Sequence, residues 1–320
     1  MASPNSTFTE MVTTTLRAHR REIVDNVSAN NALLRFLRDN GKIRTETGGY
    51  EIACPIDYAE NSTYMRYSGY DPLNVGASDV LSAAKYDWAQ AAIHVTASGR
   101  EIRMNSGEAA MIKLVKARVK NAMRTAANNM SIDLYSDGSL TNQIGGLALI
   151  IQNAGTGTVG GINSSTYTFW KNKFKEMTGT NTYASIYSDM LELWLSLTRG
   201  SDQPDLIVAS HDLYKAYEAG QEGYRQYRPG DTKATAGFEA SQYKGKPLIF
   251  DSNTNFSTTA EKMYFLNTNY LELVEHPDAR WTQDDDKVPT NQDAVVIPMY
   301  WMGQLTCSNR SLQGVLIDAA

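Results

Sequence analysis

One stretch of the sequence, Asn105 to Asp137, has the residue pattern of a single long helix. Apolar residues recur along it at steps of three and four, which places them on one face of a helix: Ile112, Val115, Val119, Ala122, Ala126, Met130 and Leu134. Asn105 can cap the first turn, and Glu108, three residues later, would complete a capping box. Such a helix spans roughly 45 Å at about 1.5 Å per residue, which is too long for the core of one compact domain. We therefore expect a spine helix to which other parts of the chain attach.

A second face of this helix is basic. It carries four cations, to which Arg118 adds a fifth: Lys113, Lys116, Lys120 and Arg124. No acidic residue lies between Ala109 and Ile132, although the net charge of the whole chain is −5. Two interpretations remain open, a solvated helix surface and an electrostatic contact with a polyanion or an acidic partner. A contact of this kind would be weak and independent of base sequence.

The composition narrows the class of protein. A length of 320 residues and a hydrophobic content of 42% suit one elaborated domain or two modest ones with a real core. The net charge of −5 argues against a dedicated nucleic-acid binder. Cys54 and Cys307 lie far apart without CxxC spacing, so we expect no disulfide framework. Met1 to Thr15 shows no signal region, and no apolar run approaches the roughly 18 residues that cross a bilayer. We expect a soluble protein made inside the cell, without membrane contact.

The first 44 residues predict an arm. Thr9 to Asn26 and Asn31 to Arg38 have helical patterns with many charges and little apolar surface, so we expect the arm to pack on a partner. A strand follows at Tyr50 to Tyr58, where apolar and polar residues alternate with a period of two. Pro55 cannot donate to a ladder, so this strand should be an edge or part of a two-stranded element.

The predicted return strand of this hairpin is Tyr86 to Ser98, with alternating apolar residues. The long connection between the two strands, Ala59 to Lys85, is typical of a functional loop. It contains three tyrosines and an arginine: Tyr64, Arg66, Tyr67 and Tyr70. Because an isolated hairpin is marginal in water, we expect this one to lean on a neighbouring subunit.

The rest of the chain predicts a central α/β unit. The expected strands are Ile144–Gln152, Asp205–Ala209, Lys246–Asp251, Lys262–Glu275, Ala294–Met302 and Leu312–Asp318, the last two interrupted by Pro298 and Gly314. The expected helices are Ile186–Thr198, ended by Gly200, and a helix capped by Ser210 that runs to Ala219.

Several patterns suggest chemistry weakly. Gly155 to Gly160 matches the dinucleotide fingerprint GxGxxG, but the following residues, Gly161 to Thr166, are a poor helix start, which favours a flexible surface loop over cofactor binding. The four histidines fall in separate segments without metal-ligand spacing: His19, His94, His211 and His276. Asp284 to Asp286 lacks the regular spacing of a calcium loop and favours an exposed turn. We expect no catalytic residue, no metal and no cofactor.

The order of arm, hairpin, spine helix and α/β unit resembles the major capsid proteins of tailed bacteriophages. The similar local motifs are Asn26-Val27-Ser28 to Leu34, Gly41 to Arg44, Gly48-Gly49, Tyr67 to Leu73, Tyr135 to Gly138, Ile144 to Leu147, Pro204 to Val208 and Gly245 to Leu248. The resemblance covers nearly the whole chain; each motif alone is weak, and their order and spacing make it fairly specific.

The resemblance implies an α+β shell fold, shared with lambdoid phages and the floor of herpesvirus capsids. The implied parts are an arm (1–44), an extended hairpin (45–98), a peripheral domain with the spine helix (99–142 and about 265–305) and an axial domain (143–264 and about 306–320). Some members of the family crosslink through a lysine and an asparagine, a pair that cannot be placed in this sequence. The chain begins at the arm, so we expect no scaffolding region before it.

The implied function is that of a shell protein, which assembles into pentamers and hexamers of an icosahedral head around double-stranded DNA. The hairpin would overlap a neighbouring subunit, with Tyr64, Arg66, Tyr67 and Tyr70 at subunit contacts, and the basic helix face would line the interior. The implied partners are copies of the chain, scaffold and portal proteins, and DNA through weak contacts, with decoration proteins as further candidates. The protein would be made in the bacterial host cytoplasm and reside in the virion. Two alternatives are an encapsulin-type nanocompartment shell and, more remotely, a nucleotide-binding enzyme that uses the Gly155 to Gly160 loop.

Overall fold

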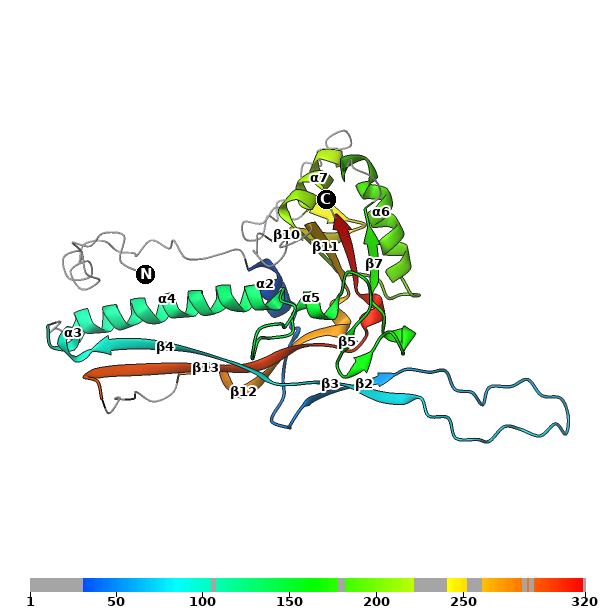
Figure 1. Ribbon diagram of the computed structural model, residues 1–320, viewed down its shortest axis with the longest axis horizontal. Coiled ribbons are helices and arrows are strands. Elements are labelled where there is room, and N and C mark those ends of the chain that lie inside the picture. The colour runs from blue at the N-terminus through cyan, green and yellow to red at the C-terminus, as the bar shows by residue number, and fades with distance from the viewer. Residues whose placement is uncertain are drawn as a thin grey trace.

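The computed structural model describes residues 31–104, 108–177, 182–221, 241–251, 261–283, 287 and 291–318. Two sheets and a protruding hairpin form the molecule (Figure 1). A four-stranded sheet and the longest helix extend together in one direction, and the hairpin extends in the opposite direction. A six-stranded sheet covered by two helices stands above the point where these two parts meet.

The four-stranded sheet supports the spine helix. Its order is β1 (Ile43–Thr45), β12 (Leu271–Gln283), β13 (Ala294–Cys307) and β4 (Ala89–Ser98). The predicted helix is confirmed as α4 (Glu108–Leu134), which is preceded by the short α3 (Gly99–Met104). The described part of the apolar stripe faces the protein, where Ala122 packs with Val95 of β4 and Met299 of β13. Asn105 lies outside the described residues, so the capping box stays a prediction.

The six-stranded sheet is mixed and buried on both faces. Its order is β7 (Lys173–Glu176), β14 (Gly314–Asp318), β11 (Glu261–Leu266), β8 (Leu206–Ala209), β10 (Lys246–Phe250) and β9 (Ser241–Tyr243). Along β8, Leu206 and Val208 join one core cluster while Ile207 and Ala209 join another. A strand with both faces covered needs a continuous apolar run, which is what the sequence shows.

Two helices cover one face of this sheet: α6 (Thr182–Leu197) and α7 (His211–Gln221). The predicted register of α6 is confirmed, because Ile186, Met190, Leu193 and Leu197 are all buried. Ser210 precedes α7, and its carbonyl accepts a hydrogen bond from the Tyr214 amide. Among the described residues the Ser210 hydroxyl has no hydrogen-bond partner, so the predicted side-chain cap is wrong.

The extended hairpin consists of β2 (Ile52–Asp57) and β3 (Leu81–Tyr86), which have no other strand partner in the described part of the chain. The predicted alternation of β2 is confirmed, since Ile52, Cys54 and Ile56 are buried and the residues between them are exposed. The predicted return strand was wrong, because β4 pairs along its whole length with β13 instead of with β2. Alternation identified β4 as a strand but carried no information about its partner, which lies some 200 residues away.

Four further expectations are corrected. Ile144–Gln152 is not a strand. It contains a short helix, α5 (Leu147–Ile150), which buries Leu147 and Ile150. β13 continues through Pro298. Proline has no backbone N–H, which is tolerated here because the pairing of β13 with β12 ends at the next residue, Met299. Gly314 begins β14 and does not interrupt it, and Thr268 to Tyr270 form a 3-10 turn that divides the predicted strand from Lys262 to Glu275 into two.

One part of the predicted arm belongs to the body. Helix α2 (Ala32–Asp39) buries Leu33, Leu34 and Leu37 in the same core cluster as Leu134 of the spine helix. We had expected the arm to pack on a partner, but its three leucines give this helix an apolar face wide enough to pack on its own chain. Residues 1–30 lie outside the described residues.

Candidate subunit-contact surfaces

The loop between β2 and β3, residues 58–80, is held by its own polar contacts. At the tip, the Asp71 amide donates to the Ser68 carbonyl at 3.2 Å, and the Ser68 amide donates to the Asp71 carboxylate at 2.9 Å. These reciprocal bonds close a turn around Gly69, whose positive φ of 56° glycine adopts without strain. Farther down, the hydroxyls of Ser62 and Ser78 lie 3.4 Å apart and link the two sides of the loop.

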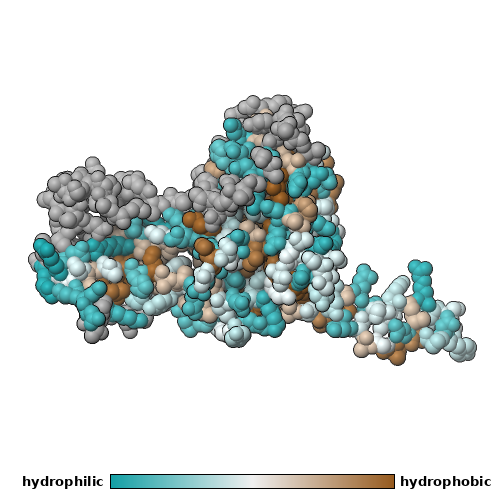
Figure 2. Space-filling view, in the orientation of Figure 1, coloured by the Kyte–Doolittle hydropathy of each residue, from teal (hydrophilic) through white to brown (hydrophobic). Residues whose placement is uncertain are grey.

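The tip exposes its aromatic side chains. Tyr64 is 82% exposed, Tyr67 66% and Tyr70 fully so, and Arg66 is also exposed. Figure 2 shows apolar patches along this protruding loop. Leu73 and Val75 are exposed as well, at 56% and 89%. We had not predicted these two as contact residues, although an apolar pair beside the tyrosines could have indicated them.

The predicted basic face of α4 is described in part. The side chains of Lys113 and Lys116 lie outside the described residues. Lys120 is exposed and Arg124 is half-buried. Lys120 therefore lies on the outer side of the helix, and the role of the four-cation face stays a prediction.

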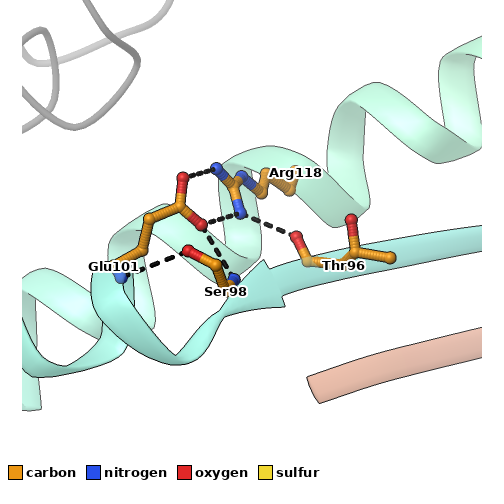
Figure 3. Close-up of polar contacts among 4 residues, drawn as sticks. All are labelled: Thr96, Ser98, Glu101 and Arg118. Carbon is orange, nitrogen blue, oxygen red and sulfur yellow. Dashed lines mark hydrogen bonds and ion pairs between the residues drawn. The ribbon is translucent and has the colours of Figure 1, made fainter. Parts of the chain in front are cut away.

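Arg118 does not belong to this face, because it turns toward β4 and α3 (Figure 3). Its guanidinium donates to the Thr96 carbonyl at 2.7 Å and to both oxygens of the Glu101 carboxylate. Glu101 also accepts from the Ser98 amide at 3.0 Å. These hydrogen bonds, with that from Arg118 the largest cause, lower the pKa of the Glu101 carboxyl. Arg118 thus joins α4 to the start of α3 and is a structural cation.

The GxGxxG segment does not have the geometry of a dinucleotide site. Two short strands, β5 (Thr158–Val159) and β6 (Ile162–Asn163), form a hairpin across it, and no helix begins at Gly160. A pyrophosphate would therefore meet no helix N-terminus. Thr156 and Thr158 are exposed, as expected of a surface loop, and the flexibility of the loop stays a prediction. Ser164 is buried, and its hydroxyl donates to the Gly157 carbonyl at 2.9 Å, which holds the loop closed.

The remaining candidates stay dispersed. His94 and His211 are exposed on separate elements, His276 is half-buried beside Trp88, and His19 lies outside the described residues. Asp284 to Asp286 also lie outside them. Within the described ranges, no three histidine, cysteine or acidic side chains gather as a metal site would require. No helix in the described part of the chain is long and apolar enough to span a membrane.

No protein-family model and no curated protein matches this sequence. Solved structures do match it over nearly its whole length. A subunit of the cyanophage A-1(L) capsid aligns with a TM-score of 0.64 at 14% identity, over 93% of this chain and 95% of that one. A capsid subunit of a native GTA particle aligns with a TM-score of 0.61 at 12% identity, over 99% and 100%.

An encapsulin complex from Synechococcus elongatus contains a similar chain, with a TM-score of 0.58 at 10% identity, over 97% of this chain and 95% of that one. The neighbours thus include tailed-phage capsid proteins and an encapsulin. The chain has the shell fold of tailed-phage capsid proteins, as its sequence motifs predicted. The fold alone does not separate a phage head from a nanocompartment.

Proposed function

We propose that this chain is the major capsid protein of a tailed bacteriophage, which assembles into pentamers and hexamers of an icosahedral head. The observation that carries the proposal is the hairpin, which extends from a shell-type fold and exposes Tyr64, Tyr67 and Tyr70. Aromatic side chains supply much of the energy of protein interfaces, at about 2 kcal/mol for each ring that is fully buried.

A second copy of the chain is the partner that this surface fits best. A two-stranded ribbon is marginal on its own, and contact along its length with a neighbour would stabilise it. Subunits that contact each other in this head-to-tail manner form closed rings if the rotation closes. Pentamers and hexamers are such rings.

The head would enclose double-stranded DNA, with the basic face of α4 toward the interior. Its cations would contact phosphates weakly and without sequence preference. Scaffold and portal proteins would assist assembly in the bacterial host cytoplasm, and decoration proteins are further candidate partners. The domain boundaries implied by the sequence are part of this proposal, with one change. β4 is assigned to the peripheral domain and not to the hairpin, because it pairs with β13 in the four-stranded sheet.

The experiment is to express the full chain, with and without the neighbouring genes of its source, and to examine the product by light scattering and electron microscopy. We expect rings and closed shells. A compact monomer at high concentration, with the hairpin protected from protease, would contradict the proposal. Nuclease-protected double-stranded DNA inside native particles would distinguish a phage head from an encapsulin-type shell, whose content would be a protein cargo.

A further inference from the structure

The base of the hairpin rests against the glycine loop, residues 155–160. The Lys85 amide of β3 donates to the Gly160 carbonyl at 2.9 Å, which adds a rung to the otherwise open edge of the ribbon. Gly160 has a φ of +59°, and a Cβ placed on it would lie 2.9 Å from the Ala84 Cβ and 3.2 Å from the Tyr86 ring. Only glycine permits both this backbone conformation and this approach.

Two other contacts hold the paired part of the hairpin, one at each end. Tyr86 is buried, and its hydroxyl donates to the Cys307 carbonyl at 2.7 Å at the end of β13. At the loop end of the ribbon, just after β2, the Tyr58 ring centroid lies 5.9 Å from that of Phe169 in the segment after the glycine loop. The paired part of the hairpin is therefore held at both of its ends.

Arg310 holds the glycine loop in place through hydrogen bonds to backbone carbonyls. It is fully buried, and its guanidinium donates to the carbonyls of Ile150, Thr156 (3.1 Å) and Trp170 (3.5 Å). Among the described residues no carboxylate forms an ion pair with it. The planar guanidinium has five donors in a fixed geometry, so it can serve carbonyls from three segments at once. A lysine has one nitrogen and cannot reach three such acceptors from the same position.

We infer that Arg310 and the glycine loop form a socket that fixes the direction in which the hairpin leaves the body. Arg310 and Gly160 are positioning residues in this inference, since neither reaches the exposed tip. The inference rests on the proposed function in one respect only, namely that the direction of the hairpin matters because its tip meets a neighbouring subunit.

Two adjacent glycines provide a matched test. Gly161 also has a positive φ, +75°, but a Cβ on it would meet nothing within 4 Å. Gly160→Ala and Gly161→Ala therefore impose a similar backbone strain, and only Gly160→Ala presses on the hairpin. The readouts, on unassembled subunits, are hydrogen exchange of the Lys85 amide and thiol labelling of Cys54, which is buried in β2. Mass spectrometry of the labelled peptides separates Cys54 from Cys307.

We expect both readouts to be faster by about tenfold in Gly160→Ala than in Gly161→Ala, since only the methyl group at position 160 overpacks against Ala84 and Tyr86. Exchange in the six-stranded sheet should be the same in both. Equal rates at Lys85 and Cys54 in the two variants would overturn the socket. If Gly160→Ala does not fold, Arg310→Lys replaces it, with the same readouts against the native chain, and unchanged rates would overturn the inference.

Assembly is measured separately on the same variants. If the hairpin loosens in Gly160→Ala and shells fail to form, both the socket and the proposed role of the tip are supported. If the hairpin loosens and normal shells still form, the socket stands and the proposed role of the tip fails.

Discussion

Arg118 on α4 and Glu101 on α3 form a two-point contact, in which Nη2 lies 3.0 Å from one carboxylate oxygen and Nη1 lies 3.3 Å from the other. Both side chains are mostly buried, so solvent screens the pair less than it screens an exposed pair. The contact therefore connects α3 directly to α4.

The first prediction concerns the stability that this pair provides. In a double-mutant cycle with Arg118→Gln and Glu101→Gln, we expect a coupling of about 1 kcal/mol in the free energy of unfolding. Lys120→Gln, on the exposed side of the same helix, is the control and should change stability by less than about 0.5 kcal/mol. Chemical denaturation of unassembled subunits measures both, and a coupling of zero would contradict the prediction.

The same pair predicts a pH dependence. The folded pKa of Glu101 is lowered, so its contribution is fully present above the unfolded pKa of about 4.3 and is lost as the pH falls through the lower, folded value. The difference in unfolding free energy between the native chain and Glu101→Gln should therefore shrink below about pH 4. A difference that stays constant from pH 7 to pH 3 would show that the ionised carboxylate is not the stabilising form.

The hairpin tip should be required for assembly but not for folding. Deleting Tyr64 to Asp71 should leave the circular dichroism and the denaturation midpoint of the subunit nearly unchanged, because the tip packs on no core. Shell formation should stop. Tyr70→Ser, a smaller change, should raise the concentration needed for assembly, whereas Tyr50→Ser alters an equally exposed tyrosine outside the tip and is the control. Normal shells from the deletion variant would show that the tip has no role.

The basic face of α4 should affect DNA contact rather than capsomer formation. Changing Lys113, Lys116, Lys120 and Arg124 to glutamine should weaken DNA retention. It should also flatten the salt dependence of retention, by up to about 3.6 in the slope of log K against log salt. Arg118→Gln is the control. Because Arg118 already pairs with Glu101, this substitution should leave the slope unchanged. If packaging is intact and capsomers instead dissociate, the four cations belong to subunit contacts.

The two cysteines should be unreactive in the native protein. Both are buried and unpaired, and burial raises the pKa of Cys54 and raises that of Cys307 to about 12. At pH 8 only about one Cys307 thiol in 10,000 would then be ionised, and the thiolate is the reactive form. A thiol reagent should label the unfolded chain quickly and Cys307 of the native chain very slowly. Rapid native labelling of Cys307 would contradict its burial.

Sequence patterns predicted the elements that depend on local periodicity. The stripe from Val119 to Leu134 and the alternation of Ile52, Cys54 and Ile56 each reflect a single packed face, so the spacing alone identifies them. The partner of β4 was not predictable in this way, because strand pairing joins segments far apart in the chain. The apolar run of α5 was too short to distinguish a strand from a turn of helix.

The side-chain roles were harder to predict. Arg118 and Lys120 are two residues apart on one helix, and sequence alone does not show that the first turns inward to Glu101 while the second faces solvent. Gly160 belongs to a segment that matches a nucleotide-binding motif, but the absence of a side chain there permits the close approach of Ala84. Arg310 carried no signal at all, because its acceptors are backbone carbonyls, which any sequence supplies.

Because the hairpin is long, a small rotation at its base moves its tip by a large distance. From Tyr86 back to the turn at Gly69 the ribbon could extend up to roughly 55 Å, at about 3.3 Å per residue. At that length, a rotation of about 5° at the base moves the tip by about 5 Å, which exceeds the reach of a hydrogen bond. In the proposed shell, small tilts at Lys85 and Gly160 would thus be sufficient to redirect the tyrosines toward neighbours set at different angles, as a closed surface of varying curvature would require.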